Sequence, residues 1–230
     1  MIYRAIQETN ARRVAFVGIA KHAGKTTVMN DLIERATLDG RTLGIVSIGV
    51  DGERNDAIMG VPKPEVHVPA GALVASAGDV LTAGSATLKI VEATGISSPL
   101  GDVYLAEVTG AGTVVLAGIR YAAQVAQVLQ RMEARGAQLC FVDGAFERMM
   151  AASPELTDGV VLATGAVVGR TVEDVVRKSV YFLQRFSLPV AEESVGRLLD
   201  IAVQEQALVV GVWRDRVDGS ADTADTVGMV

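Results

Sequence analysis

Apolar residues along this chain fall into short, nearly continuous runs. Val14–Val17, Thr42–Ile48, Leu139–Val142, Gly159–Ala163 and Ala207–Trp213 all follow this pattern. Runs of this length without a regular polar alternation are typical of strands that are buried on both faces of a parallel sheet. The pattern therefore predicts five such strands, spread along most of the chain.

Between these runs the apolar residues recur every three or four positions, which is the spacing of an amphipathic helix. Helices are predicted over Thr26–Leu38, Tyr121–Arg135 and Val172–Phe186, with Thr171 capping the last, and a shorter helix over Ser194–Ala202. A strand, a helix and a second strand in this order form a βαβ unit, whose strands are normally parallel. The expected fold class is α/β, with a mostly parallel sheet and helices on both of its faces.

The stretch from about 61 to 119 has a different character, with several prolines, many glycines and short alternating segments. Asp102–Val108 and Thr113–Ala117 are predicted to form a hairpin across a four-residue loop, and Leu88–Glu92 a short helix. We interpret the stretch as a β-rich insertion within one domain. That domain is expected over residues 1–213, followed by a loose polar tail over residues 214–230.

Composition narrows the class of protein further. Half of the 230 residues are hydrophobic, and the 21 basic residues do not cluster against 27 acidic ones, so a nucleic-acid partner or an anionic membrane surface is disfavoured. No apolar run has the length of a membrane span, and the first residues lack the pattern of a signal peptide, so a cytoplasmic protein is expected. The single cysteine, Cys140, lies in an apolar run and is expected to be a buried thiol.

One glycine-containing loop carries the clearest chemistry. Gly18-Ile-Ala-Lys-His-Ala-Gly-Lys-Thr-Thr27 lies between a predicted strand and a predicted helix, where unpaired N–H groups at the helix start favour an anion. Gly24 allows a phosphate to approach the backbone, Lys25 can reach the β- and γ-phosphates, and the hydroxyl of Thr26 can coordinate Mg²⁺. The residues expected to bind nucleotide are Gly18, Lys21, His22, Ala23, Gly24, Lys25, Thr26 and Thr27. The implied ligands are ATP and Mg²⁺.

The spacing of this loop departs from the usual phosphate-binding pattern. Five residues, not four, separate Gly18 from the Gly-Lys-Thr that begins at Gly24. Lys21 either reaches a phosphate, in this chain or in a partner subunit, or is a solvated lysine of an exposed loop. His22 is expected to contribute its backbone N–H rather than to act as an acid or base.

Acidic residues follow two of the predicted strands, at the sheet edge where ligands of parallel sheets bind. Asp143 is predicted to be a ligand of Mg²⁺ or of its water, with a turn or helix cap as the alternative. Asp51 is likewise interpreted either as a metal ligand or catalytic residue, or as part of an Asp-Gly turn. Lys25, Asp51 and Asp143 are therefore the candidate catalytic residues, and Thr26, Asp51 and Asp143 the candidate metal ligands. Weaker candidates are Glu53, Arg54, Asp56 and Arg148, and Thr164–Gly165 stands where base or ribose contacts often fall.

The five-residue spacing resembles the modified P-loop of dethiobiotin synthetase and of the cobyrinic acid amidotransferase synthetases, in the MinD-like branch of P-loop NTPases. A resemblance covering most of the chain, to about residue 200, is to the small subunit of the lysine 5,6-aminomutase reactivase. It is carried by segments in the same order along the chain: Ser47–Glu53, Lys63–Gly71, Leu73–Ala77, Thr94–Ile96 with Pro99–Gly101, Val142–Ala145 with Arg148, and Ala163–Ala166.

This resemblance implies an ATPase subunit that works with a larger ATPase partner to reactivate an adenosylcobalamin-dependent aminomutase, by ATP-driven release of damaged cobalamin. Two other functions stay open. One is an ATP-dependent ligase acting on a carboxylate or carbamate, as dethiobiotin synthetase does. The other is an adaptor that binds nucleotide as a switch without hydrolysing it. A homodimer is also left open.

Overall fold

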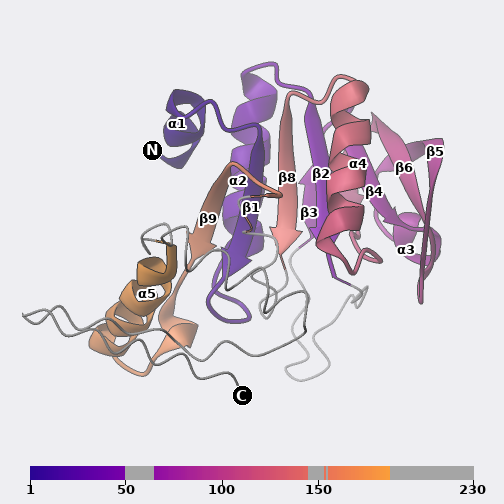
Figure 1. Cartoon of the computed structure of the whole chain (residues 1–230). Helices are drawn as coiled ribbons and strands as arrows, with labels where there is room; N and C mark the ends of the chain where they lie inside the picture. The colour runs from indigo at the N-terminus through magenta and orange to yellow at the C-terminus, as the bar shows by residue number, and fades with distance from the viewer. Residues whose placement is uncertain (50–64, 145–152, 154, 187–230) are drawn as a thin grey trace, which may run out of the picture. The chain divides into compact units, whose positions relative to one another are not determined.

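The computed structural model describes residues 1–49, 65–144, 153 and 155–186 (Figure 1). By its internal contacts the chain divides into Met1–Phe182 and Leu183–Val230, and of the second unit only the helical residues 183–186 are described. The predicted helix over Ser194–Ala202, the predicted strand over Ala207–Trp213 and the tail over residues 214–230 lie outside the described residues. Met1–Phe182 holds all the strands that the structure describes.

A seven-stranded sheet forms the centre of this unit, with the strand order β5-β6-β4-β2-β8-β1-β9. The strands β4, β2, β8, β1 and β9 run parallel to one another, and β6 and β5 join antiparallel at one edge. The protein is thus an α/β protein with a mostly parallel central sheet. The strands are β1 (Arg13–Gly18), β2 (Leu43–Ile48), β4 (Leu73–Ala77), β5 (Thr87–Ser98), β6 (Gly101–Gly110), β8 (Leu139–Gly144) and β9 (Gly159–Ala163).

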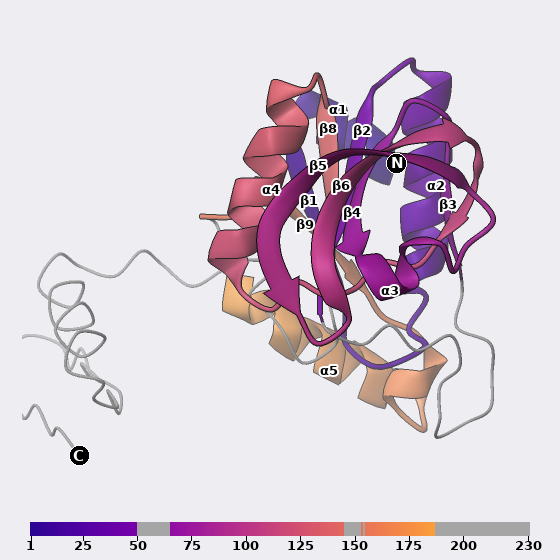
Figure 2. The ribbon, with the colours of Figure 1, turned by 90° about the vertical axis from the view of Figure 1, so that its right-hand side faces the viewer.

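Helices cover the two faces of the sheet, as Figure 2 shows for α2 (Lys25–Leu38) and α4 (Ala122–Ala134) on opposite sides. Alternate residues of each strand point to opposite faces. Val14 of β1 belongs to the core beneath α2, whereas its neighbour Ala15 belongs to the core beneath α4. Both faces are therefore apolar, which explains why the central strands read as continuous hydrophobic runs.

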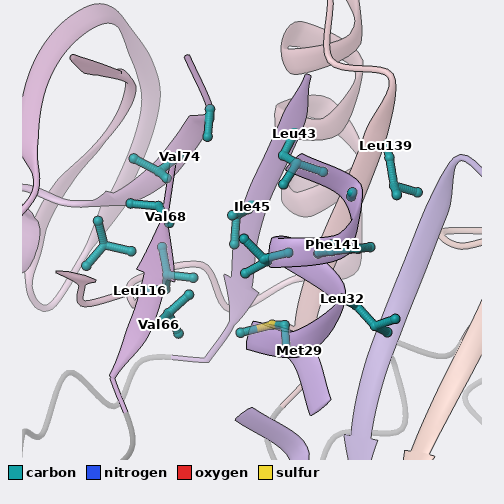
Figure 3. Packing of buried hydrophobic residues seen from close by; sticks show 14 of the residues in the cluster. Met29, Leu32, Leu43, Ile45, Val66, Val68, Val74, Leu116, Leu139 and Phe141 are labelled. Atoms are coloured by element: carbon teal, nitrogen blue, oxygen red, sulfur yellow. The ribbon is translucent and has the colours of Figure 1, made fainter. Parts of the chain in front are cut away.

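The core beneath α2 is built around the buried residues Met29 and Leu32 of the helix (Figure 3). Here the rings of Phe16 in β1 and Phe141 in β8 meet edge to face, with their centroids 5.0 Å apart and their planes at 80°. Both side chains are fully buried. Aromatic pairs in this geometry add stability beyond the area they bury, so the contact links the two strands firmly.

The antiparallel edge corrects two sequence predictions. Leu88–Glu92, predicted as a short helix, lies within the long strand β5, which pairs with β6. The predicted hairpin between Asp102–Val108 and Thr113–Ala117 is also wrong: β6 pairs with β4 and β5, and the next strand, β7 (Gly112–Val114), pairs with β3 (Val66–Val68) in a separate two-stranded sheet. The actual hairpin is β5–β6, which turns at Gly101 with φ +86°.

Of the remaining elements, α1 (Ile2–Glu8) was not predicted, α3 (Gly78–Leu81) is a single turn, and a short 3₁₀ helix, η2 (Ala166–Val168), follows β9. The helix α5 (Val172–Phe186) has the predicted bounds. Its predicted cap is confirmed, because the backbone N–H of Asp174 donates to Oγ1 of Thr171 at 3.2 Å. None of the helices in the described part of the chain is long and apolar enough to span a membrane.

Candidate functional site

The loop between β1 and α2 is fixed at both ends. Gly18 closes β1, and the next N–H, that of Ile19, donates to the carbonyl of Ala163 in β9 at 3.0 Å. Within the loop the N–H of Ala23 donates to the carbonyl of Ala20 at 3.3 Å. The loop is therefore a short folded turn joined to the neighbouring strand end.

Two residues of this loop adopt a positive φ, His22 at +60° and Gly24 at +91°. Backbone turns that contain left-handed residues bring successive N–H groups together and form concave anion sites. Gly24 is also the N-cap of α2 and provides no side-chain cap bond. A Cβ placed on Gly24 would meet no atom within 4 Å. The positive φ of Gly24 favours glycine at this position, whereas the space around its Cα would admit a side chain.

Lys25, the first residue of α2, forms an ion pair between its Nζ and Oδ1 of Asp143. Both side chains are largely enclosed, with 20% and 13% of their surfaces exposed. Asp143 stands next to last in β8, in register with Phe16 of β1 and Ser47 of β2. The hydroxyl of Ser47 donates to the main-chain carbonyl of Asp143 at 3.2 Å, which helps to fix that strand end.

The donor set around this pair suits Mg²⁺ and a phosphate chain. The Thr26 hydroxyl and the Asp143 carboxylate are oxygen ligands of the kind that Mg²⁺ prefers, and the ion usually keeps several waters and substrate oxygens besides one or two protein ligands. Lys25 and the loop amides supply the positive charge that phosphates require. Among the residues that the structure describes, no group of three His, Cys, Asp or Glu side chains forms a metal cluster. Lys25, Thr26 and Asp143 thus carry the groups that could hold Mg²⁺ together with a phosphate.

The structure thus brings the predicted loop residues 18–27 and Asp143 to one place. The other predicted metal ligand and catalytic residue, Asp51, lies outside the described residues, as do Glu53, Arg54, Asp56 and Arg148. Thr164–Gly165 follows β9 directly beside the loop, since a Cβ on Gly165 would stand 3.6 Å from the carbonyl oxygen of Ala23. The hydroxyls of Thr164 and Ser179 are hydrogen-bonded at 2.8 Å, so this strand end is connected to α5.

Sequence reasoning missed two pockets. One, of about 480 Å³, adjoins the loop between β1 and α2. It is lined by Ile19 and Ala20 of the loop, Val167 and Val168 of η2, and Arg177, Lys178, Tyr181 and Phe182 of α5. The only signal for it in the sequence is the apolar pair Val167–Val168, which follows the glycine after β9. The other, of about 560 Å³, lies by the amino ends of β1 and β8, under α1. Its lining includes Tyr3, Arg12 and Arg41. This pocket could not be predicted from the sequence, because the helix α1 that forms part of it was not predicted.

We compared the chain with protein-family models, with curated proteins and with solved structures, and none of the three comparisons found a match.

Proposed function

We propose that this protein binds a magnesium–nucleoside triphosphate on the loop Gly18–Thr27, with ATP as the expected nucleotide. The observation that carries the proposal is the pairing of Lys25 with Asp143 at the start of α2. A phosphate-binding lysine and a metal-binding carboxylate have to lie within reach of one another and of an anion-binding helix start. Lys25 and Asp143 are 118 positions apart in the sequence, and the fold brings them into contact.

Each residue has a distinct role in the proposal. Lys25 and the amides of the loop neutralise phosphate charge, and Thr26 and Asp143 hold Mg²⁺. When bound, the ion screens the phosphate oxygens and orients them. Asp51 is included from its position in the sequence, as a further metal ligand or as the residue that orders the γ-phosphate side.

For the wider role we propose a subunit of an ATP-dependent reactivating factor for an adenosylcobalamin-dependent aminomutase. The support is the resemblance of ordered segments, among them Leu73–Ala77, which is strand β4, and Ala163–Ala166, which borders the phosphate loop. In this role the chain works with a larger ATPase subunit, and nucleotide turnover is coupled to release of damaged cobalamin from the client enzyme.

The first test is nucleotide binding and hydrolysis by the full chain, with and without Mg²⁺. Lys25→Ala is expected to abolish turnover, because a positioned donor of this kind contributes roughly 3–4 kcal/mol in the transition state. Lys89→Ala is the matched control, since Lys89 lies on the exposed edge strand β5. Hydrolysis that is equal in the wild type and in Lys25→Ala would reject the catalytic role. Failure of the wild type to bind any nucleotide would reject the proposal as a whole.

The second test concerns the wider role. The chain, its larger partner subunit and an aminomutase loaded with damaged cobalamin are incubated with ATP, and recovery of aminomutase activity is measured after fresh cofactor is added. Recovery that depends on ATP and is lost with Lys25→Ala supports a reactivating factor. Release of ADP only when a carboxylate or carbamate is added would instead indicate a ligase, and tight ATP binding without hydrolysis would indicate a switch.

A further inference from the structure

We infer that the pocket between the phosphate loop and α5 holds the base of the bound nucleotide. The base is bound by stacking and apolar contact rather than by hydrogen bonds to its edge. This inference rests on the proposed nucleotide site. It concerns the base of the nucleotide, whereas the loop Gly18–Thr27 accounts only for the phosphates. The pocket's volume of about 480 Å³ lies within the usual range for small-ligand sites.

The pocket shares a wall with the phosphate loop. Ile19 and Ala20 line it, and the same Ala20 accepts the backbone bond from Ala23 that shapes the loop. A ligand whose phosphates lie on the loop amides therefore has this pocket as a neighbour. The opposite wall is η2 and α5, which are joined by a hydrogen bond from Nζ of Lys178 to the carbonyl of Val168 at 2.7 Å.

The surfaces that line the pocket match a flat aromatic ring. Tyr181 and Phe182 lie in edge-to-face contact, with ring centroids 6.4 Å apart. Tyr181 is nevertheless 60% exposed, and Val167 is 54% exposed. Exposed apolar surface gathered in a concave site indicates a binding surface, and a nucleobase is a ligand that would cover both an aromatic and an aliphatic wall.

The polar groups of the lining argue against strict base selection. Besides the Tyr181 hydroxyl, the side chains that carry polar atoms are Arg177 and Lys178, both of them donors only, and no carboxylate is among the described lining residues. Within the described lining, the exocyclic amine of adenine and the N1–H and amine of guanine thus meet no side-chain carboxylate. Arg177 is itself paired with Asp174, its Nη2 lying 2.7 Å from Oδ1. We therefore expect ATP and GTP to bind within about tenfold of one another, because a larger preference needs a dedicated pair of edge contacts.

The experiment is calorimetric titration of the full chain with ATP, GTP and inorganic tripolyphosphate, each with Mg²⁺. ATP should bind at least roughly tenfold more tightly than tripolyphosphate, since stacking on an aromatic side chain typically contributes that much or more. Tyr181→Ala should weaken ATP by about the same factor and leave tripolyphosphate unchanged, which also shows that the variant's loop is folded. Tyr181→Phe should retain ATP affinity. Tyr121→Ala is the matched control, because Tyr121 is also 60% exposed and precedes α4, away from the pocket.

The outcomes distinguish failure of the base pocket from failure of the phosphate site. If tripolyphosphate binds as tightly as ATP, or if Tyr181→Ala leaves ATP affinity unchanged, the pocket does not hold the base and the phosphate site stands. A preference of GTP over ATP, or the reverse, by a hundredfold or more would overturn recognition by stacking. If none of the three ligands binds, the proposed function fails and this inference fails with it.

Discussion

Lys25 and Asp143 are held together as an ion pair, although one begins α2 and the other stands near the end of β8. The ion pair engages the two side chains that the proposed ligand would contact, since the lysine would bind a phosphate and the carboxylate would bind Mg²⁺. Binding of Mg-nucleotide therefore has to exchange this contact for two new ones. In the pair, the charge of each side chain is compensated by the other.

This exchange predicts the effect of Asp143→Asn on metal dependence. The variant loses a negative charge close to the phosphates as well as a metal ligand, so ATP without Mg²⁺ should bind several-fold more tightly than to the wild type. The gain that Mg²⁺ gives the wild type should largely disappear. Titrations with ATP in EDTA and in excess Mg²⁺ measure both effects, and Asp102→Asn, at an exposed position of β6, serves as the control. An undiminished gain from Mg²⁺ in Asp143→Asn would remove Asp143 from the metal site.

A second prediction concerns the packing between β2 and α4. A Cβ on Gly44 would stand 2.8 Å from Sγ of Cys140 and 2.9 Å from Sδ of Met132, both of which are fully buried. Gly44→Ala should therefore lower the free energy of unfolding by about 1–3 kcal/mol, the usual cost of overpacking a core. Gly159→Ala is the control, because its Cβ would meet only Cβ of Ala11 at an ordinary 3.8 Å. Urea denaturation of both variants gives the comparison, and equal stabilities would show that the core relaxes around the extra methyl group.

The ion pair between β1 and α4 predicts a dependence of stability on pH. Nε and Nη2 of Arg13 donate to the two carboxylate oxygens of Glu133 at 2.7 and 2.6 Å, and each side chain is 19% exposed. The hydrogen bonds from Arg13 lower the pKa of Glu133, outweighing the opposing effect of burial. Because the folded-state pKa is depressed, the stabilisation is complete above the ordinary glutamate pKa and is lost as the pH falls through the lowered value.

Glu133→Gln should consequently lower the free energy of unfolding by about 1–2 kcal/mol near neutral pH. The difference from the wild type should shrink in acid, where the wild-type carboxylate is protonated. Glu8→Gln is the control, since the Arg4–Glu8 pair is exposed at 81% and 60% and should contribute little. A difference for Glu133→Gln that is the same at neutral and acid pH would show that shape, and not charge, is responsible.

The lone cysteine predicts chemical inertness. Cys140 is fully buried in the core beneath α4, and burial raises the pKa of its thiol to about 12. The thiolate is the reactive form, so its fraction at pH 8 is about a thousandfold lower than for a thiol at its ordinary pKa of 9.0. A chromogenic disulfide reagent should label the native protein only at the rate of unfolding and the urea-unfolded protein within the mixing time. Rapid labelling of the native chain would show that the core opens readily.

The central strands and helices could be predicted because the pattern of apolar residues in each shows which of its faces are buried. The run Val14–Val17 is apolar on both faces and forms β1, and Tyr121–Arg135 has one apolar stripe that packs on the sheet as α4. The position of the loop Gly18–Thr27 was also predictable, since β1 ends at Gly18 and α2 begins at Lys25, as its sequence indicates.

The antiparallel edge was harder to predict, because its pairings are decided by distant residues. Leu88–Glu92 has apolar residues at spacings that suit either a helix or a strand, and pairing with β6 decides for the strand. The glycines after β6 suggested a hairpin with β7, yet β7 pairs with β3, whose Val66 and Val68 pack into the core beneath α2. The pocket beside Tyr181 is likewise built from three segments that no local pattern connects.

The rings of Phe16 and Phe141 are in contact. Phe16 lies two residues before Gly18, where β1 ends, and Phe141 lies two residues before Asp143 in β8. The loop after β1 and the acidic end of β8 thus both follow a ring contact inside the core, at a depth that solvent does not reach. Across related proteins these two aromatic positions should change together, a larger ring at one being matched by a smaller side chain at the other.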